Sequence, residues 1–329
     1  SRFTRSSSEK FMSLLSIKNL SVETAYDSRT LVNSISLDIE KGEAIGVVGE
    51  SGSGKTLSAL SILGLLPRGV QISSGSIVYN GKDLVTSNAE TLRSIRGREI
   101  SMIYQDPMTA LNPVMKLGDQ LREVIDSHQP KSPDINQMIF DAFKEVGIPD
   151  PDRAFHSYPH EFSGGMRQRV MIAMALILSP ELLIADEPTT ALDVTIQQQI
   201  LALVLEERRK RNMSMLWITH DLGVVANLVD KVIVMYAGRI VEIGSVERIF
   251  KEPQHPYTAG LLASLPKASD KNRTRLASIP GVPPKPWLVG ESCAFAPRCS
   301  RVIEQCKVSK PELVSANGTS SACFNRVGA

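Results

Sequence analysis

The chain of 329 residues has almost no net charge, few aromatic residues and no cysteine before Cys293. The formal charge of +2, from 37 basic and 35 acidic residues, argues against a general polyanion binder, so we expect no nucleic-acid partner. The longest apolar run, Val170–Leu178, has nine residues. Because a membrane-spanning helix needs about 20 residues, we expect that this chain does not itself cross a bilayer.

Hydrophobic residues make up 42% of the chain and charged residues 22%, which is typical of a soluble protein with a packed core. The first residues are polar, and no apolar stretch of a secretion signal follows them. We interpret residues 1–13 as an unstructured tail or an artificial remnant, with Met12 as a candidate natural start. The lack of a signal peptide indicates a cytosolic address, where stable disulfides are not expected.

Short β-rich runs alternate with amphipathic helices between residues 14 and 245, which is the pattern of an α/β domain. The clearest helix covers Ile196–Asn212. Beyond residue 245 prolines crowd the sequence, and all four cysteines lie among them. We call residues 246–329 the C-terminal extension, and we expect a separate, loop-rich unit that needs a staple to hold its shape. The buried-strand candidates are Ile45–Val48, Ile100–Tyr104, Leu182–Ala185, Met215–Thr219 and Val232–Met235.

A phosphate-binding loop is the most specific motif. Residues 49–56 read Gly-Glu-Ser-Gly-Ser-Gly-Lys-Thr, which fits G-x-x-x-x-G-K-[ST] in full between an expected strand and an expected helix. The backbone N–H groups of such a loop surround phosphate oxygens, and the helix N-terminus adds a positive dipole. We predict that Lys55 contacts the β- and γ-phosphates and that the Thr56 hydroxyl binds Mg²⁺. The predicted nucleotide-binding residues are Gly49, Ser51, Gly52, Ser53, Gly54, Lys55 and Thr56.

Two adjacent acids, Asp186 and Glu187, end the strand candidate Leu182–Ala185. Strand ends in open α/β sheets face the ligand crevice. We predict that Asp186 binds Mg²⁺ and that Glu187 polarises the water that attacks the γ-phosphate. Such a pair also occurs as a plain polar strand cap, but the phosphate-binding loop earlier in the chain favours the catalytic interpretation.

Residues 162–169 read Phe-Ser-Gly-Gly-Met-Arg-Gln-Arg and resemble the signature motif of ABC (ATP-binding cassette) ATPases. The first and fifth residues depart from the general LSGGQ form. The serine is also a good N-cap for a helix over Met166–Leu178, and the two interpretations agree, because a helix N-terminus binds phosphate. The resemblance implies that the γ-phosphate of ATP held by the opposite subunit is bound by Ser163, Gly164 and Gly165.

Other residues match the same family. Gln105 resembles the Q-loop glutamine, which senses Mg²⁺ and the γ-phosphate and couples to the membrane partner, and we therefore predict it as a third Mg²⁺ ligand. His220 resembles the switch histidine that contacts the γ-phosphate, and Asp193 resembles the D-loop residue at the dimer interface. The family places an aromatic near the end of the first strand to stack on adenine. Thr24 sits close to that register, and Tyr26 is the nearest aromatic and our candidate.

The resemblance to ABC ATPases implies a P-loop NTPase fold over residues 14–245. Its parts would be a RecA-like core, an antiparallel β subdomain and a helical signature subdomain at about residues 107–179. It also implies that two ATPase subunits sandwich two ATP molecules. The alternatives are a soluble ABC ATPase of DNA repair or translation, which usually carries coiled coils or two cassettes, and a metabolic kinase or GTPase, which lacks the signature motif.

A narrower resemblance covers nearly the whole chain. Gln105–Pro113, Asp186–Thr195, His255–Thr258 and Ile279–Gly281 are similar to stretches of ATP-binding subunits of dipeptide and oligopeptide importers. This implies a peptide-import ATPase on the cytoplasmic face of the inner membrane. Its implied partners are a paralogous second ATPase subunit, two transmembrane permease subunits and an extracytoplasmic solute-binding protein. Importers of nickel, other metal complexes or antimicrobial peptides share much of the pattern and remain alternatives.

The cysteines of the C-terminal extension follow the spacing C-x5-C-x6-C-x16-C. Four clustered thiols in a reducing compartment indicate a four-thiolate metal site, although the C-x2-C knuckles typical of structural zinc are missing. Iron–sulfur clusters accept more varied spacing. The peptide-importer resemblance implies a structural [4Fe–4S] cluster, with Zn²⁺ and free thiols as alternatives. The residues are Cys293, Cys299, Cys306 and Cys323.

Overall fold

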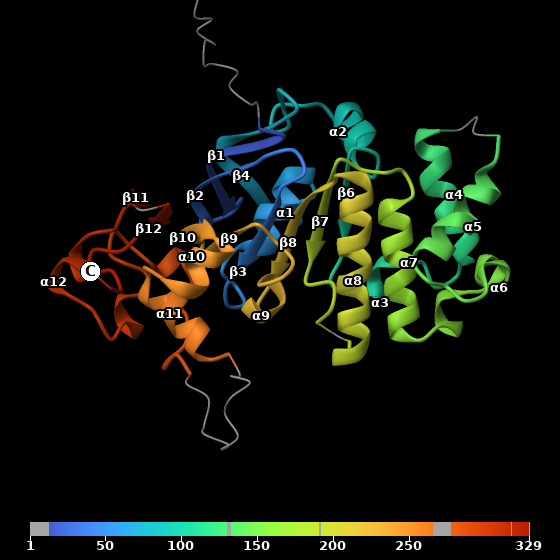
Figure 1. Ribbon diagram of the computed structural model, residues 1–329. Helices are drawn as coiled ribbons and strands as arrows, with labels where there is room; N and C mark the ends of the chain where they lie inside the picture. The colour runs from blue at the N-terminus through green and yellow to red at the C-terminus, as the bar shows by residue number, and fades with distance from the viewer. Residues whose placement is uncertain (1–12, 130–132, 191, 266–277, 317, 329) are drawn as a thin grey trace, which may run out of the picture.

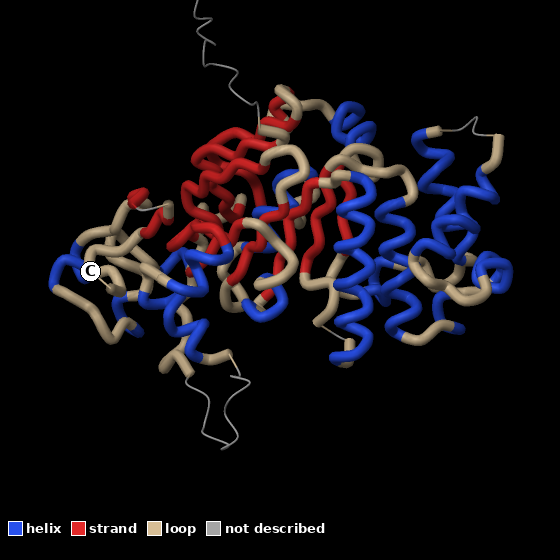
Figure 2. The backbone as a smooth tube through the Cα atoms, in the orientation of Figure 1, coloured by secondary structure: helices blue, strands red, loops and turns tan. Residues whose placement is uncertain are grey.

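A computed structural model describes residues 13–129, 133–190, 192–265, 278–316 and 318–328 (Figure 1). Residues 1–12 lie outside these ranges, so the expected tail stays a prediction. The described chain forms two β-sheets, of four and eight strands, with helices around them (Figure 2). Every described helix is too short or too polar to cross a membrane.

The larger sheet is mixed and has the strand order β11-β12-β10-β9-β3-β8-β7-β6. Its strands β9, β3, β8, β7 and β6 are mutually parallel, and all five strand candidates are confirmed. Both faces of these strands are buried, as is usual for parallel sheets. The five strands cover, in this order, Lys231–Tyr236, Ala44–Val48, Ser214–Thr219, Leu182–Asp186 and Ile100–Ile103.

The two faces of the larger sheet belong to different cores, because successive side chains of a strand point to opposite sides. In β7, Leu182 and Ile184 join a cluster with the antiparallel sheet and helix α1 (Lys55–Leu63). Leu183 and Ala185 join a cluster with the long helices on the other face. The antiparallel sheet has the order β2-β1-β4-β5, with bounds Thr30–Ile39, Leu15–Thr24, Val70–Tyr79 and Lys82–Asp83.

A helical region stands at the right of Figure 1, beyond the end of the larger sheet. Its helices α4, α5 and α6 pack on one another, and α4 and α5 also pack on α7. Helix α7 runs from Gly164 to Leu176, close to the predicted span, and α8 runs from Val194 to Arg211. The remaining helices outside the extension are α2 (Ala89–Ile95), α3 (Pro107–Ala110), α4 (Leu117–His128), α5 (Ile135–Glu145), α6 (Pro151–His156), η1 (Pro159–Glu161) and α9 (Leu222–Val225).

The C-terminal extension shares a sheet with the rest of the chain. Its strands β11 (Val314–Ala316) and β12 (Thr319–Ser321) pair with each other, and β12 adds to β10 (Arg239–Ser245). The expectation of a separate stapled unit therefore does not describe the contacts seen, and a division at residue 245 stays a prediction. The extension also contains α10 (Val246–Lys251), α11 (Pro256–Ala263), η2 (Pro286–Leu288), η3 (Ala296–Arg298) and α12 (Glu304–Val308).

Side chains and strand pairing together hold the extension on the sheet. The fully buried Glu242 carboxylate of β10 accepts the backbone N–H groups of Gln254 and His255 at 2.6 and 3.0 Å. The Tyr236 ring of β9 lies 4.6 Å from the Tyr257 ring and 5.3 Å from the Phe295 ring, measured between centroids. These contacts bring the extension next to the ends of the parallel strands.

Candidate nucleotide-binding and hydrolysis site

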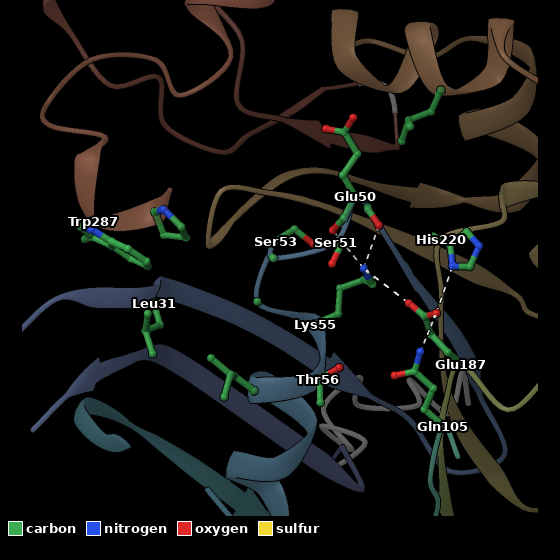
Figure 3. Close-up of a pocket in the computed structure, with 16 residues that line it drawn as sticks. Leu31, Glu50, Ser51, Ser53, Lys55, Thr56, Gln105, Glu187, His220 and Trp287 are labelled. Carbon is green, nitrogen blue, oxygen red and sulfur yellow. Dashed lines mark hydrogen bonds and ion pairs between the residues drawn. The ribbon is translucent and has the colours of Figure 1, made fainter. Parts of the chain in front are cut away.

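The phosphate-binding loop lines a cavity of about 770 Å³ at the carboxyl ends of the parallel strands (Figure 3). The loop leaves β3 and enters α1, as the motif predicts. Gly54, at the N-cap of α1, has φ 98°, which favours glycine. A Cβ on Gly49 would lie only 2.2 Å from the Met235 carbonyl oxygen, so this position also requires glycine. Ser53 Oγ is buried, and no residue in the described ranges offers it a hydrogen bond.

Lys55 lies beneath the loop with its side chain 5% exposed. Its Nζ donates to the carbonyl oxygens of Gly49 and Glu50 at 2.7 and 3.1 Å, and lies 4.0 Å from Glu187 Oε1. Burial lowers the pKa of this ammonium group, while the nearby carboxylates oppose the shift. A buried cation at the centre of a backbone loop suits a phosphate oxygen better than a neutral ligand.

The Thr56 hydroxyl donates to Asp186 Oδ1 at 3.1 Å, so two of the three predicted Mg²⁺ ligands meet, whereas the Gln105 amide contacts Glu187. Burial raises the pKa of Asp186, and the hydrogen bond from Thr56 counteracts part of that shift. A buried carboxylate beside a hydroxyl oxygen offers the hard oxygen ligands that Mg²⁺ prefers. These two residues therefore fit a magnesium ion on the chemistry of their donors.

The Glu187 carboxylate in the cavity contacts three other polar side chains. Its Oε2 lies 3.0 Å from His220 Nδ1, accepts the Thr190 hydroxyl at 3.0 Å and accepts Gln105 Nε2 at 3.5 Å. The backbone of Glu187 has φ 46°, which turns the chain as β7 ends, so that both acids of the pair reach the site. Gln105, Glu187 and His220 follow the neighbouring strands β6, β7 and β8, which explains why residues far apart in sequence converge.

The signature residues do not reach this cavity. Ser163 Oγ caps α7 by accepting the Met166 N–H at 3.4 Å, as predicted. Ser163 and Gly164 are exposed, and a Cβ on Gly164 would meet nothing within 4 Å. Asp193 likewise caps α8, with its Oδ1 accepting the Ile196 N–H at 3.0 Å. The N-terminus of α7 is therefore exposed and lies outside the cavity.

Tyr26 does not line the cavity. Its side chain is 96% exposed, and it lies near Gly69 at the turn that follows β1. The wall opposite the catalytic residues contains Leu31 from β2 and Trp287 from the extension instead (Figure 3). The cavity thus has a polar phosphate end and an apolar outer end.

Residues of the extension also contact the phosphate-binding loop at Glu50. Arg298, 5% exposed, forms two hydrogen bonds with the Glu50 carboxylate at 2.6 and 3.0 Å, and Glu50 raises the pKa of the guanidinium. The same guanidinium donates to the Tyr236 hydroxyl at 3.2 Å. The Glu50 N–H donates to the Tyr257 hydroxyl at 2.9 Å. Two groups, the Arg298 guanidinium and the Tyr257 hydroxyl, therefore hold the second residue of the loop from outside the motif, and Tyr236 contacts the first of them.

The four cysteines lie in one region but do not form a metal site as placed. The Cys293 N–H donates to the Cys306 carbonyl oxygen at 2.9 Å. Burial raises the pKa of Cys323 to about 11, and charges on the other three thiols add to the shift. Across the described ranges, however, no three His, Cys, Asp or Glu side chains are close enough to hold a metal ion. This arrangement does not fit the expected four-thiolate site.

Sequence reasoning assigned no role to Thr190, Tyr257, Trp287 or Arg298. Thr190 lies in the stretch Asp186–Thr195, which carried the peptide-importer resemblance. A hydroxyl three residues after Glu187 could therefore have been predicted to contact it. Tyr257 lies in the stretch His255–Thr258, which carried the peptide-importer resemblance without a physical role. Nothing in the local sequence of Trp287 or Arg298 indicates contact with the loop.

Comparisons with known proteins agree with this geometry. A family profile described as ABC transporter matches residues 32–190. A second, described as the C-terminal region of oligopeptide/dipeptide transporters, matches residues 241–306. The solved structure of cbiO1 from Clostridium perfringens, part of the ABC transporter complex cbiONQ, superposes with a TM-score of 0.62 at 27% identity, covering 73% of this chain and 91% of that one.

Curated relatives match over nearly their whole length. The dipeptide transport ATP-binding protein DppD of Bacillus subtilis is 50% identical and covers 89% of this chain, with 88% of its own length matched. The oligopeptide transport ATP-binding protein OppD of Haemophilus influenzae is 48% identical, covering 92% of this chain and 94% of its own length. The chain belongs to the family of ABC transporter ATP-binding proteins that includes DppD and OppD.

Proposed function

We propose that this chain is the ATP-hydrolysing subunit that energises the import of dipeptides and oligopeptides through partner permease subunits. The observation that carries the ATPase role is the Glu187 carboxylate, which is positioned by His220, Thr190 and Gln105 beside the buried Lys55. Support for the peptide substrate comes from the likeness to DppD and OppD, which are named for dipeptide and oligopeptide transport.

In this proposal the loop binds the phosphates of ATP, Lys55 contacts the β- and γ-phosphates, and Glu187 accepts a proton from the attacking water. His220 and Gln105 keep the Glu187 carboxylate oriented and border the γ-phosphate position. Mg²⁺, when bound by Thr56 and Asp186, neutralises phosphate charge. The buried ammonium of Lys55 and the backbone N–H groups of the loop stabilise the negative charge that develops on the phosphoryl oxygens.

A second ATPase subunit completes the proposed site. The exposed N-terminus of α7, with Ser163, Gly164 and Gly165, would bind the γ-phosphate of ATP held by that partner. This proposal is supported by the position of these residues, because they line no part of the cavity of their own chain. We propose a paralogous ATPase as this partner. Two permease subunits and an extracytoplasmic solute-binding protein would complete the importer, with this chain on the cytoplasmic face of the inner membrane.

Reconstitution tests this function. The chain would be co-produced with candidate permease subunits and a candidate second ATPase subunit, purified as a complex and placed in proteoliposomes with a candidate solute-binding protein. We expect ATP-dependent uptake of a labelled dipeptide that stops when Glu187 is replaced by Gln. Uptake of a nickel complex in place of the dipeptide would contradict the peptide substrate, and failure to bind any permease subunit would contradict the transport role.

The [4Fe–4S] cluster stays a proposal that rests on the peptide-importer resemblance alone, because the described thiols do not form a metal site as placed. Metal analysis of anaerobically purified protein tests it. We expect about four iron ions per chain and a brown colour, both lost when Cys306 and Cys323 are replaced by Ser. Stoichiometric zinc without iron would contradict the cluster and favour Zn²⁺.

A further inference from the structure

The outer end of the ATP cavity is built by a residue of the extension. Trp287 lies in the one-turn helix η2 and lines the cavity with Leu31 and Pro286, on the side away from Glu187 and His220 (Figure 3). Its side chain is half-buried. An aromatic ring on the wall of a nucleotide cavity, beyond the phosphate-binding loop, is where a nucleobase would lie.

The position of the indole is tied to the phosphate-binding loop. Gly238 sits so close to Leu31 and Pro286 that a Cβ there would lie 2.6 Å from the Leu31 carbonyl oxygen and 3.2 Å from Pro286 Cβ. The Gly238 N–H donates to the Ser53 carbonyl oxygen of the loop at 3.1 Å. Pro286 precedes the indole directly and fixes the local φ. The loop and the ring therefore share one rigid support.

Two positively charged side chains lie next to the Trp287 ring. The Arg29 guanidinium and the Lys285 ammonium lie 5.6 and 5.4 Å from its centroid. Such contacts at exposed sites strengthen an association by a factor of about 2 to 5, whereas an aromatic ring stacked on a base contributes a factor of about 5 to 150. A stacked base therefore gains more than the loss of these two contacts costs, and Arg29 keeps its ion pair with Asp27 at 2.7 Å when it leaves the ring. Their positive charge also suits a bound triphosphate.

We propose that the Trp287 indole packs on the nucleobase of ATP, so that the extension forms the base-binding wall of the site. Trp287 takes the place that the resemblance assigned to Tyr26, which lies outside the cavity and is 96% exposed. Stacking tolerates any base because every base has a π-face. This inference rests on the proposed ATP site and names the residue of the extension that forms its outer wall.

Intrinsic fluorescence provides a direct readout, because the chain has two tryptophans and Trp217 is fully buried in β8. We expect MgATP to quench the emission of the wild-type protein. Replacing Trp287 by Phe should remove the quenching and keep most of the affinity. Unchanged emission at saturating ATP, with ATP binding verified by calorimetry, would overturn the proposal.

Affinity measurements separate base contact from damage to the loop. We expect Trp287→Ala to weaken ATP binding roughly 10-fold or more and to leave the affinity for inorganic tripolyphosphate unchanged. Unchanged ATP affinity in Trp287→Ala, together with a loss in Tyr26→Ala, would overturn the proposal. An equal loss for ATP and tripolyphosphate would overturn it too, because the ring would then only support the loop. A wild-type chain that binds neither ligand would contradict the ATP site itself.

Discussion

The phosphate end of the ATP cavity and its extension side are built in different ways. At the phosphate end, short motifs follow the ends of adjacent parallel strands, so that neighbouring strands bring Gln105, Glu187 and His220 together. On the extension side, Arg298 reaches Glu50 across 248 positions of the chain. Local motifs thus define the chemistry, whereas long-range packing determines how firmly the loop that performs it is held.

From this difference we expect substitutions at the phosphate end to lower the ATP affinity more than substitutions on the extension side. Lys55→Ala should weaken ATP binding roughly 100-fold, because the loop loses a buried charge-assisted contact to phosphate. Calorimetric titration with MgATP measures the effect. Lys41→Ala is the matched control, because Lys41 is exposed and its ion pair with Glu181 is 3.8 Å long. Equal ATP affinities for the two variants would contradict the large effect expected at the phosphate end.

Arg298→Ala should come next, with a roughly 10-fold loss of ATP affinity, because the Glu50 carboxylate would then stand unpaired beside the phosphate site. Turnover at saturating ATP should fall much less, since no catalytic contact is removed. Arg298→Lys should recover only part of the loss, because an ammonium does not form the two-pronged contact.

A double variant tests the cause of the Arg298 effect. If unpaired charge weakens binding, Arg298→Ala with Glu50→Gln should bind ATP within about threefold of the wild type, because paired residues are not additive. A double variant as weak as Arg298→Ala would show that the arginine acts through packing of the extension and not through Glu50.

Tyr257→Phe should have the smallest effect. The change removes the hydroxyl that accepts the Glu50 N–H at 2.9 Å and leaves the ring contacts with Tyr236 intact. We expect a loss of about 1 kcal/mol in the free energy of unfolding and about a threefold loss in ATP affinity. Urea denaturation and calorimetry measure the two. A loss as large as that of Lys55→Ala would contradict the order of effects.

The same difference explains what the sequence could predict. The strand candidates and the phosphate-binding loop carry their own periodicity and spacing, so their positions are confirmed. Strands β11 and β12 have three residues each, and these are small or polar side chains without a readable period. Their pairing with β10 depends on tertiary contact, so the extension was expected to stand apart.

The aromatic residue of the cavity follows the same rule. Tyr26 is the aromatic nearest to the family register in sequence, but the structure leaves it exposed and brings Trp287 to the cavity instead. Trp287 is 256 positions after Leu31, its neighbour on the cavity wall. No spacing rule connects residues that meet only because the extension folds back over β9 and β10.

One variant tests the central claim, that this chain hydrolyses ATP with Glu187 as the base. Glu187→Gln keeps the size of the side chain and its contact with Gln105 but cannot accept a proton. Steady-state hydrolysis should fall at least about 100-fold, while calorimetry should give an ATP affinity close to that of the wild type. A variant that hydrolyses ATP at nearly the wild-type rate would contradict the account.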